Sequence, residues 1–156
     1  MSQYWLLKSE PHTFSIDDLA SSPRQTTCWE GVRNYQARNF LCAMKRGEQA
    51  LFYHSNADPP AIVGLVEIVK ESYPDFYAFD SSSRYYDTKS TPDASRWFMV
   101  DVKFVKKFSS ELSLSFLRDI PELHQMELLR KGSRLSVQPV RASEWKAILR
   151  LAGTTS

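Results

Sequence analysis

The stretch Trp97-Phe98-Met99-Val100-Asp101-Val102-Lys103-Phe104-Val105 has the strongest strand character in this chain. Aromatic and β-branched residues dominate it, and such residues favour extended structure. Residues 49–54 and 62–71 have a similar composition, and the turn residues Asp58-Pro59-Pro60 separate them. A first strand over residues 4–7 and a last strand over residues 135–140 complete the predicted set.

Short helices are predicted between these strands. Ser15 followed by Asp18 is a typical helix start, and Asn34 predicts the cap of a helix over residues 35–44. We expect three further helices, which begin near Ser113 or Ser115, at Pro121 and after a Ser143 cap. This order of strands and short helices favours an α+β fold built around a small closed sheet.

Length and composition indicate one folded domain over residues 1–156. Hydrophobic residues make up 42% of the chain and aromatic residues 13%, which is enough for a real core. The longest apolar-rich run, residues 61–69, is too short to span a bilayer. The N-terminus lacks the pattern of a signal peptide, so we expect a cytoplasmic protein with no membrane partner.

Charge and cysteine content exclude several classes of site. The net charge of +2 is well below that of a non-specific duplex binder. Six acidic against three basic residues lie between positions 71 and 101, and seven basic against four acidic residues lie between positions 118 and 150. Cys28 and Cys42 form no zinc signature, and we expect both to be reduced thiols. We also expect no metal, no cofactor and a monomer.

Residues 29–40 combine stacking and hydrogen-bonding side chains. The stretch Trp29-Glu30-Gly31-Val32-Arg33-Asn34-Tyr35-Gln36-Ala37-Arg38-Asn39-Phe40 holds three aromatic residues, two arginines, two asparagines and a glutamine. Aromatic faces stack on planar rings, arginine forks bind phosphate, and carboxamides match the donor and acceptor edge of a base. The combination indicates recognition of a nucleotide or base.

Several motifs together resemble the EVE domain family. They are Tyr4-Trp5-Leu6-Leu7-Lys8-Ser9-Glu10-Pro11, the stretch from Trp29 to Asn39, Phe52-Tyr53-His54-Ser55-Asn56, Pro74-Asp75, Arg96 to Val102, and Gly132-Ser133-Arg134-Leu135-Ser136-Val137-Gln138-Pro139-Val140. The resemblance covers roughly residues 3 to 150. It implies a PUA-like fold, which is a small mixed β-barrel flanked by helices and related to the YTH domain. It also implies binding of a modified base in DNA or RNA, such as a modified cytosine.

The predicted binding site combines these motifs. Its residues are Lys8, Ser9, Glu10, Trp29, Val32, Arg33, Asn34, Gln36, Arg38, Asn39, Tyr53, His54, Ser55, Ser133, Arg134, Leu135 and Ser136. Trp29 is expected to stack on the base. Arg33 is the arginine that we most expect to contact the ligand, and Asn34 can also be a helix cap.

Other readings of these residues stay open. Trp29 and Leu135 are residue types that are more often found in the core. The arginines can serve in ordinary surface ion pairs. Tyr85 and Tyr86, in the long polar segment from residue 73 to residue 95, could cover a bound ring or could simply pack that loop.

Three classes of function fit these features. The first is a non-catalytic reader of an everted base. The second is an enzyme on a base or nucleotide, with Cys28 as nucleophile and His54 or Glu10 as base. The third is a protein-interaction module that uses the acidic, tyrosine-rich loop. We expect the first, because no phosphate-binding glycine loop or deaminase zinc signature is present in the sequence.

Overall fold

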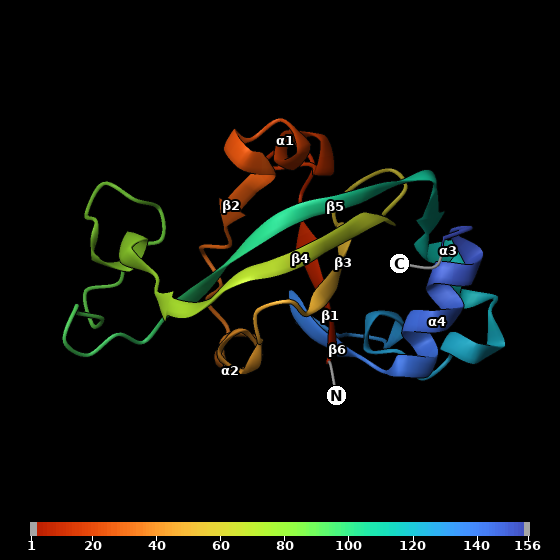
Figure 1. Ribbon diagram of the computed structural model, residues 1–156. Coiled ribbons are helices and arrows are strands. Elements are labelled where there is room, and N and C mark those ends of the chain that lie inside the picture. The colour runs from red at the N-terminus through yellow and green to blue at the C-terminus, as the bar shows by residue number, and fades with distance from the viewer. Residues whose placement is uncertain (1–2, 155–156) are drawn as a thin grey trace.

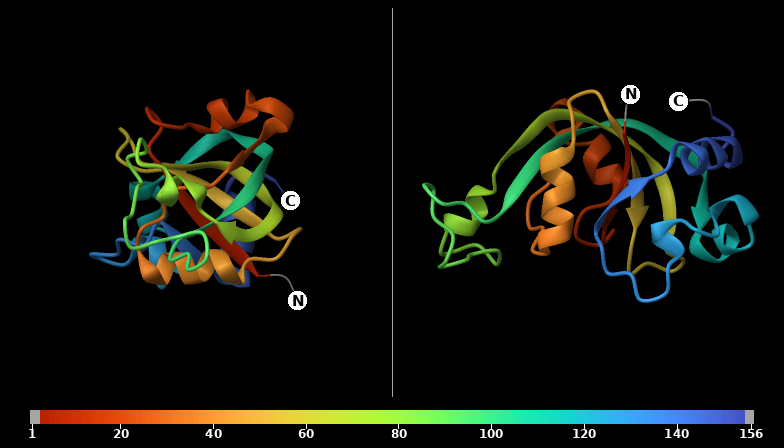
Figure 2. Two further views of the ribbon diagram at one scale, coloured as in Figure 1. Left: turned by 90° about the vertical axis from the view of Figure 1, so that its left-hand side faces the viewer. Right: turned by 90° about the horizontal axis from the view of Figure 1, so that it is seen from below.

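Two long strands, β4 (Ala61–Pro74) and β5 (Phe98–Ser113), form the antiparallel pair on which the fold is built (Figure 1). They belong to a computed structural model that describes residues 3–154. Both strands are longer than their hydrophobic patterns predicted. The pair bends over the rest of the sheet, and its register shifts at several bulges (Figure 2). At Gly64 the strands approach so closely that an added Cβ would lie 2.2 Å from the Lys106 carbonyl oxygen.

The sheet has six strands and is strongly curved but open. Its order is β2-β5-β4-β3-β1-β6, in which β1 (Tyr4–Ser9) pairs parallel with β3 (Gln49–His54). The edge strands are β2 (Thr26–Cys28) and β6 (Val137–Val140), and no ladder joins them within residues 3–154. The α+β class is therefore confirmed, whereas the expectation of a closed sheet is wrong. The short strand β2 was not predicted.

Three helices begin at the residues that the sequence indicated. Ser15 caps α1 (Ile16–Ala20), and its hydroxyl accepts a hydrogen bond from Asp18 N–H at 3.0 Å. Asn34 caps α2 (Tyr35–Ala43), and its Oδ1 accepts from Ala37 N–H at 2.9 Å. Ser113, rather than Ser115, caps α3 (Leu114–Arg118). In each case a side-chain oxygen satisfies a backbone N–H that the helix itself leaves free.

The C-terminal segment differs from its prediction at two places. The last helix, α4 (Ala142–Leu151), begins before Ser143, with Arg141 at the cap position. The Glu144 carboxylate accepts from Arg141 N–H at 2.9 Å, so an acidic residue in the first turn takes the place of a serine cap. Instead of one helix from Pro121, the chain makes two short 3-10 turns, Pro121–Leu123 and Glu127–Leu129.

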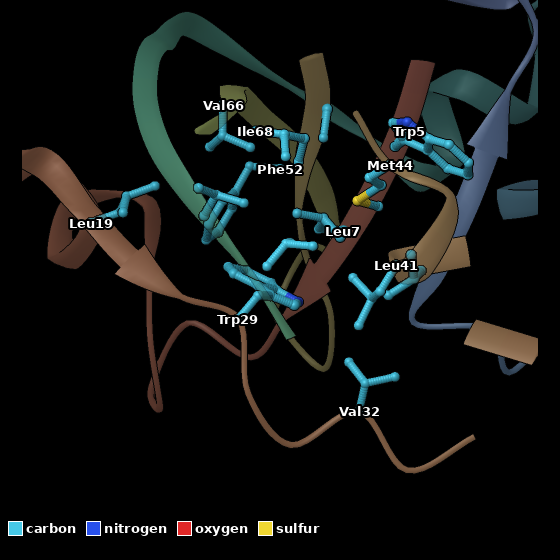
Figure 3. Close-up of a cluster of buried hydrophobic side chains, with 14 of the residues drawn as sticks. Trp5, Leu7, Leu19, Trp29, Val32, Leu41, Met44, Phe52, Val66 and Ile68 are labelled. Carbon is cyan, nitrogen blue, oxygen red and sulfur yellow. The ribbon is translucent and has the colours of Figure 1, made fainter. Parts of the chain in front are cut away.

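Two clusters of buried side chains lie on opposite faces of the sheet. Alternation along β1 places Trp5 and Leu7 in the first cluster and Leu6 in the second. Helices α1 and α2 cover the first face, while α3 and α4 cover the second. The first cluster also contains Trp29 (Figure 3), so this core extends to the segment that follows β2.

The segment between β4 and β5 projects from the end of the long strand pair (Figure 1). It begins with a 3-10 turn, Phe76–Phe79, after the fully buried Asp75. Asp75 accepts hydrogen bonds from Tyr77 N–H at 3.0 Å and from Gly31 N–H at 2.9 Å. This buried carboxylate therefore ties the loop to the segment after β2. Within residues 3–154 no helix is long and apolar enough to cross a membrane.

Candidate nucleic-acid interface

A cavity of about 370 Å³ opens beside the end of β1. Its lining residues are Lys8, Ser9, Glu10, Thr13, Phe14, Thr27, Trp29, Glu30, Gly31, Val32, Ser55, Arg84, Tyr85 and Ser136. A volume of this size fits one heterocycle and lies within the range of small-molecule sites. The wall combines an indole, a phenol ring, several hydroxyls, two carboxylates and two cations.

The sheet topology brings the ends of three strands to this cavity. Strands β1 and β3 are parallel, so Ser9 and Ser55 emerge at the same edge, where Ser55 N–H donates to the Ser9 carbonyl at 2.9 Å. Strand β6 runs antiparallel to β1, which brings Ser136 to the same place. Lys8 N–H donates to the Ser136 carbonyl at 2.9 Å. The serine hydroxyls are therefore set on backbone that the ladders hold in place.

Lys8 and Ser9 provide polar groups on the β1 side of the wall. Burial lowers the pKa of the Lys8 ammonium, and the carboxylate of Glu127 opposes this shift. The Ser9 hydroxyl donates to the Phe14 carbonyl at 2.5 Å, which fixes the turn that follows β1. A half-buried ammonium and fixed hydroxyls can hydrogen-bond to the edge of a planar ligand.

Trp29 belongs both to the core and to the cavity wall. Its side chain is only 8% exposed and meets the Phe52 ring edge-on, with ring centroids 5.5 Å apart (Figure 3). The backbone is held by a 2.7 Å hydrogen bond from Trp29 N–H to the Val100 carbonyl. The core and stacking interpretations of this residue are therefore compatible, because a buried indole can still present part of its surface to a cavity.

Tyr85 reaches the cavity from the distant β4–β5 loop. Its ring lies directly against Gly31, where an added Cβ would be 2.4 Å from Tyr85 Cζ. Gly31 also has a φ of +83°, which favours glycine. Both the space and the backbone conformation at position 31 therefore depend on the absence of a side chain, and this allows the tyrosine to form a wall.

Arg33 holds the Tyr85 loop in place and does not line the cavity. Its guanidinium donates to buried Asp75 Oδ2 at 3.0 Å and to the Tyr85 carbonyl at 2.9 Å. The Arg33 Cζ lies 5.4 Å from the Tyr85 ring centroid and 5.3 Å from that of Trp97. Arg33 was the arginine most expected to contact the ligand, but this placement makes it a structural link between two parts of the site.

Seven of the predicted site residues line the cavity: Lys8, Ser9, Glu10, Trp29, Val32, Ser55 and Ser136. The other ten lie outside it: Arg33, Asn34, Gln36, Arg38, Asn39, Tyr53, His54, Ser133, Arg134 and Leu135. Gln36 and Arg134 are exposed elsewhere, and Ser133 is half-buried. Leu135 packs against the first core cluster, as its alternative interpretation indicated.

Helix α2 carries several of these residues away from the cavity. Asn34 uses its side-chain oxygen to cap the helix. Asn39 Oδ1 accepts hydrogen bonds from Arg38 Nε at 3.1 Å and from Nη2 at 2.7 Å. Helical periodicity was assigned correctly here, but the sequence did not indicate which way the helix turns relative to the cavity.

Tyr53 and His54 are also turned away from the cavity. Tyr53 is buried in the second core cluster. His54 Nε2 accepts from Ile16 N–H at 3.1 Å and faces a separate hollow with Asp17 and Lys107. Burial lowers the pKa of His54, opposed by nearby carboxylates of Glu111 and Asp17. The histidine therefore links β3 to the start of α1.

Seven lining residues were not in the predicted site: Thr13, Phe14, Thr27, Glu30, Gly31, Arg84 and Tyr85. Of these, Tyr85 had been considered as a cover for a bound ring. Thr27 lies in the unpredicted strand β2, which is only three residues long. Thr13 and Phe14 continue the polar turn after Glu10, so extending the motif that ends at Pro11 by three residues would have found them.

The Cys28 thiol is poorly suited to nucleophilic chemistry. Burial and the carboxylate of Glu30, whose Oε2 lies 3.5 Å from Cys28 Sγ, raise the pKa of the thiol to about 12. A thiol with this pKa stays protonated at neutral pH. Across residues 3–154, no group of three or more histidine, cysteine, aspartate or glutamate side chains is placed to hold a metal ion.

Comparison with known proteins identifies the family of this chain. The family model described as the EVE domain matches residues 3–151. The chain belongs to the EVE domain family. Human thymocyte nuclear protein 1 is 45% identical over 167 residues, an alignment that covers 97% of this chain and 74% of that protein. The motifs quoted from the sequence therefore led to the correct family.

Solved structures of similar proteins have the same fold. A hypothetical protein from Leishmania major is 51% identical, with a TM-score of 0.92 over 98% of this chain and 96% of that one. Human THYN1 in complex with DNA containing 5-methylcytosine is 44% identical, with a TM-score of 0.93 over 99% and 100% of the two chains. A YTH domain from Zygosaccharomyces rouxii, at 17% identity and a TM-score of 0.54, shares the fold alone.

Proposed function

We propose that this EVE domain protein is a non-catalytic module that binds a modified base of a nucleic acid in the cavity beside Trp29 and Tyr85. The observation that carries the proposal is the cavity itself, which is sized for one heterocycle and walled by three aromatic side chains and several hydrogen-bonding groups. The 44% identical human THYN1 was solved with DNA that contains 5-methylcytosine. A modified cytosine in DNA is therefore the first ligand to test.

The chemistry of the wall supports recognition of a base edge. Glu10 and Glu30 supply carboxylates that can accept from an exocyclic amine, and Lys8, Ser55 and Ser136 can donate to ring nitrogen or carbonyl groups. Trp29 and Tyr85 supply apolar surface for the ring and for an added methyl group. Base eversion costs a few kcal/mol, which such contacts can offset.

A thiol enzyme is disfavoured by the arrangement of its candidate groups. The thiol of Cys28 is kept protonated by burial and by Glu30. His54 Nε2 is occupied by Ile16 N–H and faces a different hollow. The Cys28 thiol is therefore not activated as a nucleophile, and His54 is not placed to act as its base, so the proposal assigns the cavity to binding alone.

Titration against matched oligonucleotides tests the proposal. The same DNA sequence should carry 5-methylcytosine, cytosine or thymine at one position, with RNA versions of the cytosine pair. Thymine has the same 5-methyl group but a carbonyl in place of the 4-amino group, so it separates methyl recognition from amine recognition. We expect the 5-methylcytosine oligonucleotide to bind at least tenfold more tightly than both others. Equal affinity for all three would contradict the proposal.

Two neighbouring tyrosines provide a matched pair of variants for this titration. Tyr85 lines the cavity, whereas Tyr86 is 46% exposed and does not line it. Tyr85→Ala should weaken binding of the 5-methylcytosine oligonucleotide by about tenfold, since stacking contributes roughly 1–3 kcal/mol per base. Tyr86→Ala should leave that affinity within about twofold of the wild-type value. An equal effect of both changes would show that the cavity is not the site.

A further inference from the structure

Three arginines and three aromatic rings stack in a continuous column that starts at the cavity. The order is Arg84, Tyr85, Arg33, Trp97, Tyr35 and Arg38. Arg84 Cζ lies 4.8 Å from the Tyr85 centroid, and Arg33 lies between the Tyr85 and Trp97 rings at 5.4 and 5.3 Å. We refer to these six residues as the arginine–aromatic column.

The far end of the column lies on the first turn of α2. The Trp97 and Tyr35 rings stack with centroids 4.8 Å apart and planes 20° from parallel. Arg38 Cζ lies 4.8 Å from the Tyr35 centroid. The column therefore leads from the cavity, across the base of the β4–β5 loop, to α2.

The inner members of the column are fixed by buried or paired carboxylates. Asp75, which is fully buried, neutralises Arg33. Asp87 accepts from Trp97 Nε1–H at 2.7 Å and pairs with Arg96 at 3.7 Å. The acidic groups nearest the centre of the column are therefore already matched by cations, and the rings are held in position before any ligand binds.

The two end arginines keep their charge available. Within residues 3–154, neither Arg38 nor Arg84 has a carboxylate oxygen within 4.0 Å. Arg38 donates to neutral acceptors, which are Asn39 Oδ1 and, at 3.0 Å, the Arg96 carbonyl. Tyr35 beside it is 47% exposed. The Arg38 guanidinium, which pairs with no carboxylate and lies next to the exposed Tyr35, suits a phosphate of a single strand, whereas Arg84 shares the cavity wall with Glu10 and Glu30.

We propose that the two outer ends of the arginine–aromatic column guide the strand as it leaves the cavity on one side of the bound base, with Arg38 binding a phosphate of that flank, while the buried Trp97 and the paired Arg33 fix the column beneath it. This inference rests on the proposed function, because it requires a base in the cavity, and it adds the course of the adjoining nucleotides. A phosphate contact contributes affinity that depends on salt but does not depend on the base in the cavity.

Arg38→Gln, with Arg46→Gln as its matched control, tests the column. Arg46 is an exposed arginine that follows the same helix, beyond the column. With DNA oligonucleotides, Arg38→Gln should weaken binding to 5-methylcytosine and cytosine versions alike, by about fivefold. The slope of log K against log salt should flatten by roughly 0.7–0.9, the value for one neutralised phosphate. Arg46→Gln should change neither quantity beyond twofold.

Oligonucleotides with flanks on one side provide the second readout. The modified base should be placed at either end of a short strand, so that nucleotides extend only in the 5′ or only in the 3′ direction. Wild-type protein should prefer one direction by about fivefold, and Arg38→Gln should abolish this preference. The inference is overturned if Arg38→Gln matches Arg46→Gln, or if it lowers the ratio of modified to plain affinity. If the wild-type protein itself showed no preference for 5-methylcytosine over cytosine, the proposed function would instead be refuted.

Discussion

At the scale of single residues, the site depends on side chains that serve the fold and the cavity together. Trp29 is 8% exposed and packs edge-on against Phe52, yet it forms part of the cavity wall. Gly31 contributes by having no side chain, because this leaves the space that the Tyr85 ring occupies. Substitutions at Trp29 and Gly31 should therefore lower both the stability and the ligand affinity of the protein, but for different physical reasons.

Trp29→Ala should lower both the stability and the affinity of the protein. Removing a buried indole costs about 3–5 kcal/mol, and the stacking surface is lost at the same time. Urea unfolding should show the loss of stability, and titration under conditions where the variant is still folded should show at least tenfold weaker binding. Trp29→Phe should recover part of the stability. If folded Trp29→Ala bound the modified oligonucleotide normally, the indole would not be part of the site.

Gly31→Ala should displace Tyr85 as well as strain the backbone. The new Cβ would lie 2.4 Å from Tyr85 Cζ, and the φ of +83° disfavours alanine by about 1–2 kcal/mol. We expect at least fivefold weaker binding of the modified oligonucleotide. The double variant with Tyr85→Ala separates the two effects: the second change should add little further loss of affinity, whereas the backbone strain should persist in urea unfolding. Fully additive affinity losses would argue against a shared mechanism.

At the scale of elements, the ion pair between Arg33 and the buried Asp75 holds the β4–β5 loop next to the cavity. Asp75 accepts hydrogen bonds from Gly31 N–H, Arg33 and Tyr77 N–H, and so links segments more than 40 residues apart in the sequence. Arg33 then holds the Tyr85 carbonyl. This polar link helps to hold the loop against the segment after β2, and the order of the loop should be sensitive to it.

Asp75→Asn should loosen the loop over residues 76–97. An amide keeps the shape but loses the charge that balances Arg33, and breaking a buried pair costs about 3–5 kcal/mol. Hydrogen exchange should increase most in the loop and in residues 29–34, while β1 and β3 stay protected. Asp93→Asn, at an exposed position on the same loop, is the control and should change nothing. Uniform exchange across the molecule would show global destabilisation instead of a local anchor.

Sequence patterns predicted elements better than they predicted how those elements face one another. The caps at Ser15, Asn34 and Ser113 depend on local hydrogen bonds, which a short stretch of sequence already specifies. The open sheet depends on whether β2 meets β6, which is a long-range contact. The contacts of Arg33 illustrate the same limit. Its hydrogen-bond partners, Asp75 and Tyr85, lie 42 and 52 residues away in the sequence, and no local pattern connects them to it.

At the scale of the whole molecule, one buried carboxylate ties the N-terminal strand to the turn before β3. Glu48 is 6% exposed and accepts from Trp5 Nε1–H at 2.9 Å, Gln3 N–H at 2.9 Å and Lys45 N–H at 2.8 Å. Burial alone raises the pKa of Glu48, but the hydrogen bonds from Gln3, Lys45 and Trp5 outweigh it and leave the pKa below its ordinary value. The ionised form is therefore the one that the fold favours.

This shift gives acid stability a definite sign. A carboxyl whose pKa is lower in the folded state than in the unfolded state stabilises the fold fully above the unfolded value, near 4.3 for glutamate, and loses that contribution as the pH falls through the folded value. Glu48→Gln should cost about 1.5–3 kcal/mol at pH 7, the range for hydrogen bonds to a charged group. Urea unfolding at pH 7, 5, 4 and 3 should therefore show the difference between wild type and Glu48→Gln shrinking below pH 4, because protonation removes from the wild type what the substitution has already removed. A difference that stayed constant from pH 7 to pH 3 would mean that packing, and not ionisation, holds the first strand in place.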